Sequence, residues 1–466
     1  MLKTTEYKNK RITIMGLGLH GGGLSSALFF LKAGAKVTVT DMKKADQLKA
    51  SIDQLKGHDV KFTLGEHREE DFTKADMIIK NPGVPGSSKW LKMAALNNIA
   101  IESDISIFLR STTNPVIAVT GSKGKSTTVS AIFKGLQDKY PDARLGGNIT
   151  RSPLSFIHEL PPTAPVVLEL SSWQLADLAG KNLLRARVSV ITNILPDHMN
   201  AYASMNDYFK DKQQIYKDQQ AEDFSIFNYD DPYLRPLAED SPAQSLFFSA
   251  KALPKGINGA WLDDEKRGHC RLKGKNEWIL PAKLALAGEH NRLNLLCAAL
   301  VLRLFELDSE KIADSLSQFT GIEHRMELFL TKGSLKFYND SAATIPQATA
   351  EAVKSLEKPL YLITGGTDKN SDYSPYSEIA MIPDKIFLLK GSGTEKIQPL
   401  LDQAGAGYGG PYENLASLLD ALTKEIGSKG SVVLSPGCAS FELFDNEFDR
   451  GRQFKAGILQ RFTDQP

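Results

Sequence analysis

Residues 116–128 read VIAVTGSKGKSTT, and this stretch decides the fold. Residues 116–119 are apolar and predict a buried strand, from which a glycine-rich loop runs directly into the start of a helix. Backbone N–H groups in such a loop point at phosphate oxygens, and the helix N-terminus adds a positive dipole. Lys125 would bridge the β and γ phosphates of a nucleotide, and the Ser126 hydroxyl would bind Mg²⁺. The stretch therefore predicts a nucleoside-triphosphate loop at the end of a parallel strand.

The spacing of this loop departs from the strict phosphate-loop pattern, because Val119 stands where that pattern has its first glycine. The alternative is a glycine turn that merely exposes lysines. Strand, glycine-lysine-serine loop and helix follow one another in the required order, which favours the phosphate loop. The predicted nucleotide contacts are Gly121, Ser122, Lys123, Gly124, Lys125, Ser126 and Thr127.

Length and composition limit what the rest of the chain can be. A chain of 466 residues is too long for one core, because single cores stop growing at roughly 250–300 residues. The 56 basic and 55 acidic residues leave a net charge of +1, so no electrostatic footprint for nucleic acid exists. No stretch of about 20 apolar residues predicts a membrane span. Three scattered cysteines suit a reducing cytoplasm, where we expect the protein to act.

A second glycine turn lies near the N-terminus. Residues 12–15 predict a strand, Gly16, Gly18 and Gly21 fit the spacing GxGxxG, and a helix is expected over residues 24–33. Another strand, residues 36–40, ends at Asp41, where a ribose-binding acid would stand. A nicotinamide dehydrogenase would show the same pattern, and so would a turn that serves only packing. A hydride-transfer enzyme has no need of the phosphate loop, which favours a different nucleotide at this turn.

Polar residues also follow the next strands of the central region. Glu169 ends a strand that begins at residue 166, and Asp197 and His198 follow a strand over residues 188–192. Carboxyl ends of parallel strands face the crevice where α/β proteins bind ligands. Together with Ser126, Glu169 and His198 form an oxygen- and imidazole-containing set suited to Mg²⁺. A lone histidine is more often structural, which is the alternative for His198.

Two asparagines precede the apolar residues of a helix over 295–305. Asn291 or Asn294 could cap this helix, since asparagine is a good N-cap residue. One asparagine would satisfy that role, which leaves the other amide to contact an adenine edge.

The pattern of strands and helices predicts three α/β domains. Strands alternate with helices from the first glycine turn onward, which is typical of parallel sheets. A polar break before Pro115 separates the first domain, and a last set of strands begins after Gly321. We expect a Rossmann-like domain over residues 1–112, a phosphate-loop ATPase-like domain over 113–321 and a second Rossmann-like domain over 322–466.

The phosphate loop resembles the ATP loop of the Mur ligase family, and other motifs match the same family in its order. They are Gly146-Gly147-Asn148, Glu169-Leu170-Ser171-Ser172-Trp173-Gln174, Asp197-His198-Met199, Gly288-Glu289-His290-Asn291, Glu323-His324-Arg325, Asn339-Asp340-Ser341 and Ser435-Pro436-Gly437-Cys438-Ala439-Ser440. These motifs span nearly the whole chain. The first glycine turn, Asn81-Pro82-Gly83-Val84 and residues 435–440 are most similar to family members that add glutamate to UDP-N-acetylmuramoyl-L-alanine.

The resemblance implies an ATP-dependent ligase of peptidoglycan synthesis that uses ATP and two Mg²⁺ ions and works as a monomer. It implies contacts to the UDP substrate from Leu19, His20, Asp41, Asn81, Asn148, Ser171 and Gln174. Further ATP contacts would come from Asn291, Asn294, Arg325 and Asp340. Thr344, Lys369 and Ser440 would bind the carboxylates of glutamate. The catalytic set would be Lys125, Glu169, His198 and Lys212.

Lys212 stands at the position where the family carries an N-carbamylated lysine, which would ligate a second Mg²⁺. Its bare sequence context predicts only a solvated helix charge. Two departures concern the amino-acid pocket: Ala342 replaces the family's usual lysine, and Glu447 stands where an aromatic residue is usual. Three alternatives therefore stay open. The protein could use L-glutamate in the same reaction, it could be another ligase of the family that adds a different amino acid, or it could be an NTPase that performs no ligation.

Overall fold

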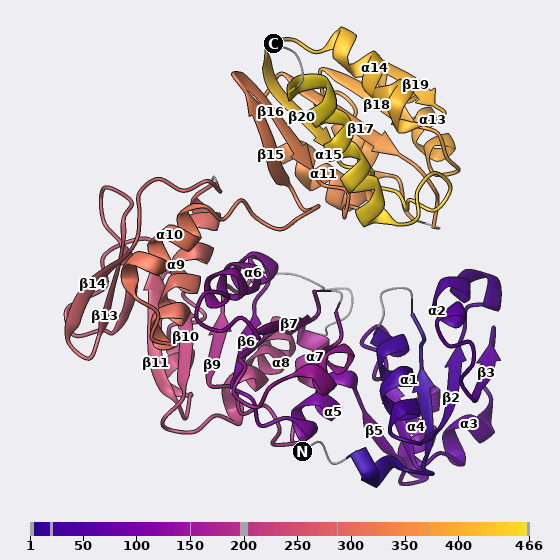
Figure 1. Cartoon of the computed structure of the whole chain (residues 1–466), viewed down its shortest axis with the longest axis vertical. Coiled ribbons are helices and arrows are strands. Elements are labelled where there is room, and N and C mark those ends of the chain that lie inside the picture. The colour runs from indigo at the N-terminus through magenta and orange to yellow at the C-terminus, as the bar shows by residue number, and fades with distance from the viewer. Residues whose placement is uncertain are drawn as a thin grey trace. The chain divides into compact units, whose positions relative to one another are not determined.

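Three largely parallel sheets form the framework of the computed structural model, and they contain the strands predicted from the sequence (Figure 1). The structure describes residues 4–18, 22–149, 151–195, 204–286, 288–369 and 371–463. The chain divides into two units, residues 1–319 with the first two sheets and residues 320–466 with the third. The predicted fold class, three α/β domains, is confirmed. No helix in the described ranges is long and apolar enough to cross a membrane.

The first sheet has the strand order of a doubly wound domain. Its five parallel strands run β3 (Val60–Leu64), β2 (Lys36–Asp41), β1 (Arg11–Met15), β4 (Met77–Lys80), β5 (Ala100–Glu102). The order reverses between β1 and β4, and ligands bind at the carboxyl ends of strands beside such a switch point. The helices here are α1 (Gly22–Lys32), α2 (Lys49–Asp53), α3 (Glu69–Thr73), α4 (Lys89–Leu96) and α5 (Asp104–Ser111), with short 3₁₀ turns η1 (Thr4–Tyr7) and η2 (Ala45–Leu48).

The second sheet is centred on β6 (Val116–Thr120), the strand that carries the phosphate loop. On one side of β6 lie β8 (Val166–Glu169) and β7 (Arg144–Gly147); on the other lie β9 (Val188–Ile191), β10 (Phe224–Asn228), β11 (Gln244–Ser249), β12 (Gly259–Leu262), β13 (Gly268–Leu272) and β14 (Lys275–Leu280). Only the β12–β13 and β13–β14 pairs are antiparallel. The sequence reasoning missed β10–β14.

Alternation along β6 assigns its two faces to different cores, because successive side chains of a strand point to opposite faces. Ile117 and Val119 pack with α6 (Lys125–Leu136), α9 (Glu289–Leu304) and α10 (Ser309–Ser317). Val116 and Ala118 pack with α7 (Ser172–Ala176) and α8 (Met205–Lys217), and with the 3₁₀ turns η3 (Pro153–Ser155) and η4 (Ile157–Glu159). A further 3₁₀ turn, η5 (Pro236–Glu239), follows β10.

The second of these cores continues into α1 and α5 of the first domain, so the first two sheets share one core. Buried ion pairs join them as well: Lys80 bonds Asp177 at 2.7 Å, and Lys181 bonds Glu102 at 2.6 Å. This shared core fixes the glycine turn after β1 relative to the phosphate loop after β6.

The third sheet forms the unit of residues 320–466, in the order β15 (Glu327–Lys332), β16 (Ser334–Asn339), β20 (Lys429–Leu434), β17 (Leu360–Gly365), β18 (Lys385–Leu389), β19 (Tyr408–Tyr412). Only β15 pairs antiparallel. Leu360 and Leu362 of β17 pack with α11 (Pro346–Ser355), α12 (Pro375–Ile379) and α13 (Thr394–Ala404). Ile363 packs on the other face with α14 (Leu415–Glu425) and α15 (Glu447–Thr463).

Candidate active site

The phosphate loop depends on glycine at two positions. Gly121 has φ +145°, and a Cβ there would lie 1.9 Å from Oγ1 of Thr192. Gly124 has φ +82° and precedes α6, and a Cβ there would lie 2.4 Å from Oδ1 of Asn294. Any larger residue would therefore displace the loop, since both positions combine left-handed backbone with a close neighbour.

The end of β9 holds the loop in place. The Ser122 N–H donates to the Asn193 carbonyl at 2.9 Å, and the Lys123 N–H donates to Asn193 Oδ1 at 2.9 Å. Thr192 Oγ1 donates to the Lys123 carbonyl at 2.6 Å. The first-turn N–H groups of α6 have no acceptor within the helix and are the donors left for an anion. The loop is thus pre-shaped, and its helix N-terminus has the geometry of a phosphate site.

Two lysines lie against this loop. Lys125 Nζ donates to the carbonyls of Gly121 and Ser122 at 2.9 and 3.0 Å. Lys212 is 2% exposed, and its Nζ donates to the Gly121 carbonyl at 2.9 Å and lies 4.6 Å from the centre of the Tyr208 ring. The solvated helix charge that bare sequence context suggested for Lys212 is therefore wrong. Its role as a carbamylated metal ligand, which the family resemblance implies, stays a prediction.

One carboxylate oxygen of Glu169 is a candidate metal ligand. The side chain is 2% exposed, and its Oε1 accepts a hydrogen bond from Asn148 Nδ2 at 2.9 Å. Its Oε2 is buried and has no hydrogen-bond donor among the residues that the structure describes. Because an unpaired buried carboxylate oxygen is costly, Glu169 fits the role of a Mg²⁺ ligand. Ser126, half-buried in the first turn of α6, offers a hydroxyl of the same ligand type.

A cavity of about 440 Å³ joins the carboxyl edges of the first two sheets. The two predicted nucleotide-binding regions both line this cavity. One is the first glycine turn with Asn81, and the other is the phosphate loop with Lys125 and Lys212. Asn148, Ser171 and Gln174, predicted to contact the UDP substrate, also line it. The full lining is Gly18, Gly22, Asn81, Pro82, Gly83, Asp104, Lys125, Gly147, Asn148, Arg151, Ser152, Ser171, Ser172, Trp173, Gln174, Tyr208 and Lys212.

Asp41 does not line this cavity and instead shapes the first glycine turn. Its Oδ2 accepts from the N–H groups of Leu17 and Gly18 at 2.9 and 3.4 Å, and its Oδ1 accepts from Lys43 N at 2.9 Å. Its predicted contact with the ribose stays a prediction. Leu19, His20, Asp197 and His198 lie outside the described residues.

The sequence reasoning missed two charged residues of the cavity. Asp104 starts α5 and is 6% exposed; burial raises the pKa of its carboxyl, and the nearby charge of Asp177 raises it further. Arg151 is exposed, its guanidinium lies 5.2 Å from the centre of the Phe156 ring, and its carbonyl accepts from Gly147 N at 2.8 Å. No local pattern marked either residue, because the shared core of the two domains brings them to the cavity.

Asn294 lies in α9 and packs against the phosphate loop. Gly288 is the N-cap residue of α9, so the interpretation of Asn291 or Asn294 as its N-cap is wrong. Asn294 is 6% exposed and its amide packs against Gly124. This position keeps it available as one wall of a nucleotide site.

In the unit of residues 320–466, the predicted amino-acid contacts gather at the carboxyl ends of β16, β17 and β20. Lys369 Nζ donates to Thr344 Oγ1 at 2.9 Å. The Oγ of Ser440 is buried and lacks a hydrogen-bond partner within the described part of the chain. Asp340 accepts from Ser435 Oγ at 2.7 Å and from Met326 N at 3.0 Å, and burial raises its pKa to about 6.

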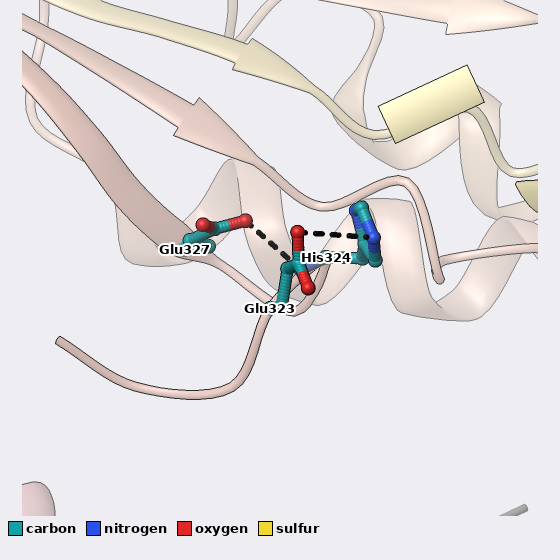
Figure 2. Close-up of side chains that lie close together, drawn as sticks. All are labelled: Glu323, His324 and Glu327. Atoms are coloured by element: carbon teal, nitrogen blue, oxygen red, sulfur yellow. Dashed lines mark hydrogen bonds and ion pairs between the residues drawn. The ribbon is translucent and has the colours of Figure 1, made fainter. Parts of the chain in front are cut away.

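A cluster of Glu323, His324 and Glu327 brings three metal-type ligand atoms within 4.8 Å of one another (Figure 2). The ammonium of Lys455 lies 2.5 Å from Glu327 Oε1 and 3.4 Å from Glu323 Oε1. Asn339 Nδ2 donates to Glu327 Oε2 at 3.0 Å and lies 2.8 Å from His324 Nδ1. The ammonium of Lys455 thus supplies the positive charge that pairs with the two carboxylates of the cluster. The cluster also fixes the turn that carries the exposed Arg325.

Comparisons with known proteins identify the family. Residues 119–302 match the Mur ligase middle domain, and residues 10–103 match the Mur ligase MurD-like N-terminal domain. The chain is 38% identical to the UDP-N-acetylmuramoylalanine--D-glutamate ligase of Treponema pallidum, over 97% of this chain and 98% of that one. The proteins of the same name from Borreliella afzelii and from a Roseiflexus species are 40% and 36% identical, over 97% and 98% of this chain and 98% and 100% of theirs.

Solved structures share the fold at low identity. The UDP-N-acetylmuramate-alanine ligase of Thermotoga maritima is similar with a TM-score of 0.55 and 16% identity, over 97% of this chain and all of that one. A murein peptide ligase of Psychrobacter arcticus is similar with a TM-score of 0.51 and 16% identity, over 97% and 99% of the two chains.

Proposed function

The chain belongs to the Mur ligase family, and we propose that it is an ATP-dependent ligase that joins D-glutamate to UDP-N-acetylmuramoyl-L-alanine in peptidoglycan synthesis. One observation carries the proposal: Lys125 of the phosphate loop lines the same cavity as Asn81 and Ser171, the predicted contacts of the nucleotide sugar. A carboxylate bound in that cavity would face the γ-phosphate of ATP. The curated relatives named above, similar over almost their whole length, support this choice of substrate.

The first half of the reaction would take place at the phosphate loop. The alanine carboxylate of the substrate attacks the γ-phosphorus of ATP, the bond to the β–γ bridging oxygen breaks, and an acyl phosphate and ADP form. Lys125 would move from its loop carbonyls to the phosphate oxygens and stabilise the charge of the transferring group. Asn294, beside Gly124, would line the nucleotide site. Further ATP contacts are proposed for Asn291, Arg325 and Asp340.

The residues around Glu169 would hold Mg²⁺. Glu169 Oε2 and the Ser126 hydroxyl are proposed as ligands, with His198 as the third and carbamylated Lys212 as ligand of a second ion. Mg²⁺ bound there would neutralise charge on the phosphates. Asn148 orients Glu169 through its hydrogen bond, as residues behind a metal ligand commonly do.

The second half of the reaction needs glutamate. Its amine attacks the acyl carbon, phosphate leaves, and the ammonium proton passes to a base, for which His198 or Asp197 is proposed. Thr344, Lys369 and Ser440 would bind the glutamate carboxylates, and the Ser440 hydroxyl, which has no hydrogen-bond partner among the described residues, supports that role. The protein would work in the cytoplasm as a monomer; its three cysteines are free, which suits a reducing compartment.

Ala342 and Glu447 keep a second candidate open, the same reaction with L-glutamate or another amino acid, because Ala342 removes a positive charge from the pocket region and Glu447 adds a negative one. The deciding experiment incubates the protein with UDP-N-acetylmuramoyl-L-alanine, ATP, Mg²⁺ and each amino acid in turn. We expect phosphate release with D-glutamate and a product of the matching mass and chirality. Release with L-glutamate alone would replace the first candidate by the second, and release without any amino acid would refute ligation.

A further inference from the structure

Arg450, in the first turns of α15, is completely buried, with 0% of its surface exposed. Its Nε donates to Ser341 Oγ at 2.9 Å, and one Nη donates to the Ser341 carbonyl at 2.9 Å. The other Nη donates to the carbonyls of Cys438 and Ala439 at 3.1 and 3.2 Å. One guanidinium therefore joins the loop after β16 to the loop after β20.

The positive charge of Arg450 has no carboxylate partner within the described part of the chain. Among the described residues, its hydrogen-bond acceptors are one hydroxyl and three backbone carbonyls, which are neutral. Burial lowers the pKa of the guanidinium to about 10, which leaves it charged at neutral pH. A buried charge without a counter-ion is costly, and an anion bound nearby would lower that cost.

The loops that Arg450 joins are those that hold the predicted amino-acid contacts. Thr344 follows Ser341 by three residues, and Ser440 follows Ala439 directly. The Ala439 backbone exchanges two hydrogen bonds of 3.0 Å with Thr367, which brings in the loop of Lys369. Arg450 and Ser440 also line one narrow pocket with Gly366 and Thr367.

We propose that Arg450 is a positioning residue of the amino-acid pocket: it sets the three loops that present Thr344, Lys369 and Ser440, and its charge favours binding of the incoming carboxylate. The inference rests on the proposed function. Ser440 Oγ lies buried in the pocket that Arg450 also lines, without a hydrogen-bond partner among the described residues. The pocket is too narrow for water, so Arg450 acts through the loops and its field and does not contact the substrate.

The test compares Arg450→Met, Arg450→Lys and a matched control, Arg461→Met. Arg461 lies on the same helix but pairs with Asp420 at 2.6 Å, away from these loops. We expect Arg450→Met to raise the KM for glutamate by about tenfold, a loss of about 1.4 kcal/mol in binding, because the loops lose the guanidinium that joins them. Arg450→Lys should raise it less, because it keeps the charge and loses the fork geometry. Arg461→Met should stay within about twofold of the wild type, as exposed ion pairs contribute little.

The KM for ATP separates positioning from general damage, because a merely structural change would alter both constants together. We expect the KM for ATP to stay within about twofold in every variant. An unchanged KM for glutamate in a folded Arg450→Met protein would overturn the inference, and so would a failure of both Arg450 variants to fold. If the wild type shows no glutamate-dependent phosphate release, the proposed function fails first and the inference falls with it.

Discussion

Glu169→Gln should stabilise the metal-free protein and at the same time abolish its activity. The carboxylate is 2% exposed and accepts one hydrogen bond, from Asn148, while Oε2 has no donor in the described part of the chain. Glutamine has the same shape and keeps the acceptor for Asn148, but it removes the buried negative charge. Stability and activity should therefore change in opposite directions at this position.

The expected gain follows from the contacts of Glu169. Burying a charge costs several kcal/mol in a real protein, and the hydrogen bond from Asn148 offsets about 1.5–3 kcal/mol of that. The glutamine amide would place an NH₂ group where Oε2 has no partner, at a cost of about 1–3 kcal/mol. The difference leaves a net gain of about 1–2 kcal/mol for the variant without Mg²⁺. Phosphate release should fall by about 100-fold or more, because loss of a ligand weakens charge stabilisation in the transition state.

Thermal unfolding in EDTA and in excess Mg²⁺ measures this directly. We expect the variant to unfold at a higher temperature than the wild type in EDTA, by about 2–4 °C, and Mg²⁺ to stabilise the wild type more than the variant. Glu159→Gln is the control, because Glu159 is exposed and should give the same response as the wild type. A variant that is less stable than the wild type in EDTA, and that Mg²⁺ stabilises equally, would refute the reasoning.

Three further variants test other parts of the site. Lys212→Ala should lose about 100-fold in kcat for phosphate release. Removal of bicarbonate should lower wild-type activity reversibly. Full activity of the variant would exclude a role of Lys212 in the metal site. Arg151→Gln should raise the KM for the UDP substrate by about tenfold through loss of a charge-assisted contact, with the KM for ATP unchanged; the reverse pattern would contradict its place in the cavity. Asp340 has a folded-state pKa of about 6, above its ordinary 3.8, so the folded state binds the proton more tightly. The free energy of unfolding of the wild type, measured in urea, should thus fall by about 3 kcal/mol as pH rises from about 4 to 6, and Asp340→Asn should lose this dependence. Parallel plots of unfolding free energy against pH for the two proteins would rule out Asp340 as the cause.

The sequence predicted the parts of the fold in which one local pattern suffices. The strands before both glycine turns were confirmed, because a short apolar run followed at once by a glycine turn and a helix has few other solutions. The cluster at the carboxyl ends of the strands was predictable too, since parallel strands place Glu169 and the phosphate loop at one edge. The antiparallel extension β12–β14 was not predicted, because its strands follow one another without helices between them.

The charged residues of the site show why the rest escaped prediction. By residue type, Asp104, Lys212 and Arg450 all belong on the surface, where lysine, arginine and aspartate are mostly found. Lys212 is buried because α8 packs against the loop after β6, 91 residues earlier, and Arg450 because α15 closes over Ser341, 109 residues earlier. Burial of this kind depends on the packing of distant elements, which leaves no local periodicity to read. Each of these buried charges is energetically unfavourable unless an anion, a cation or the hydrogen bonds of a loop compensate its cost. The positions at which residue type and burial disagree are therefore the ones most worth testing for function.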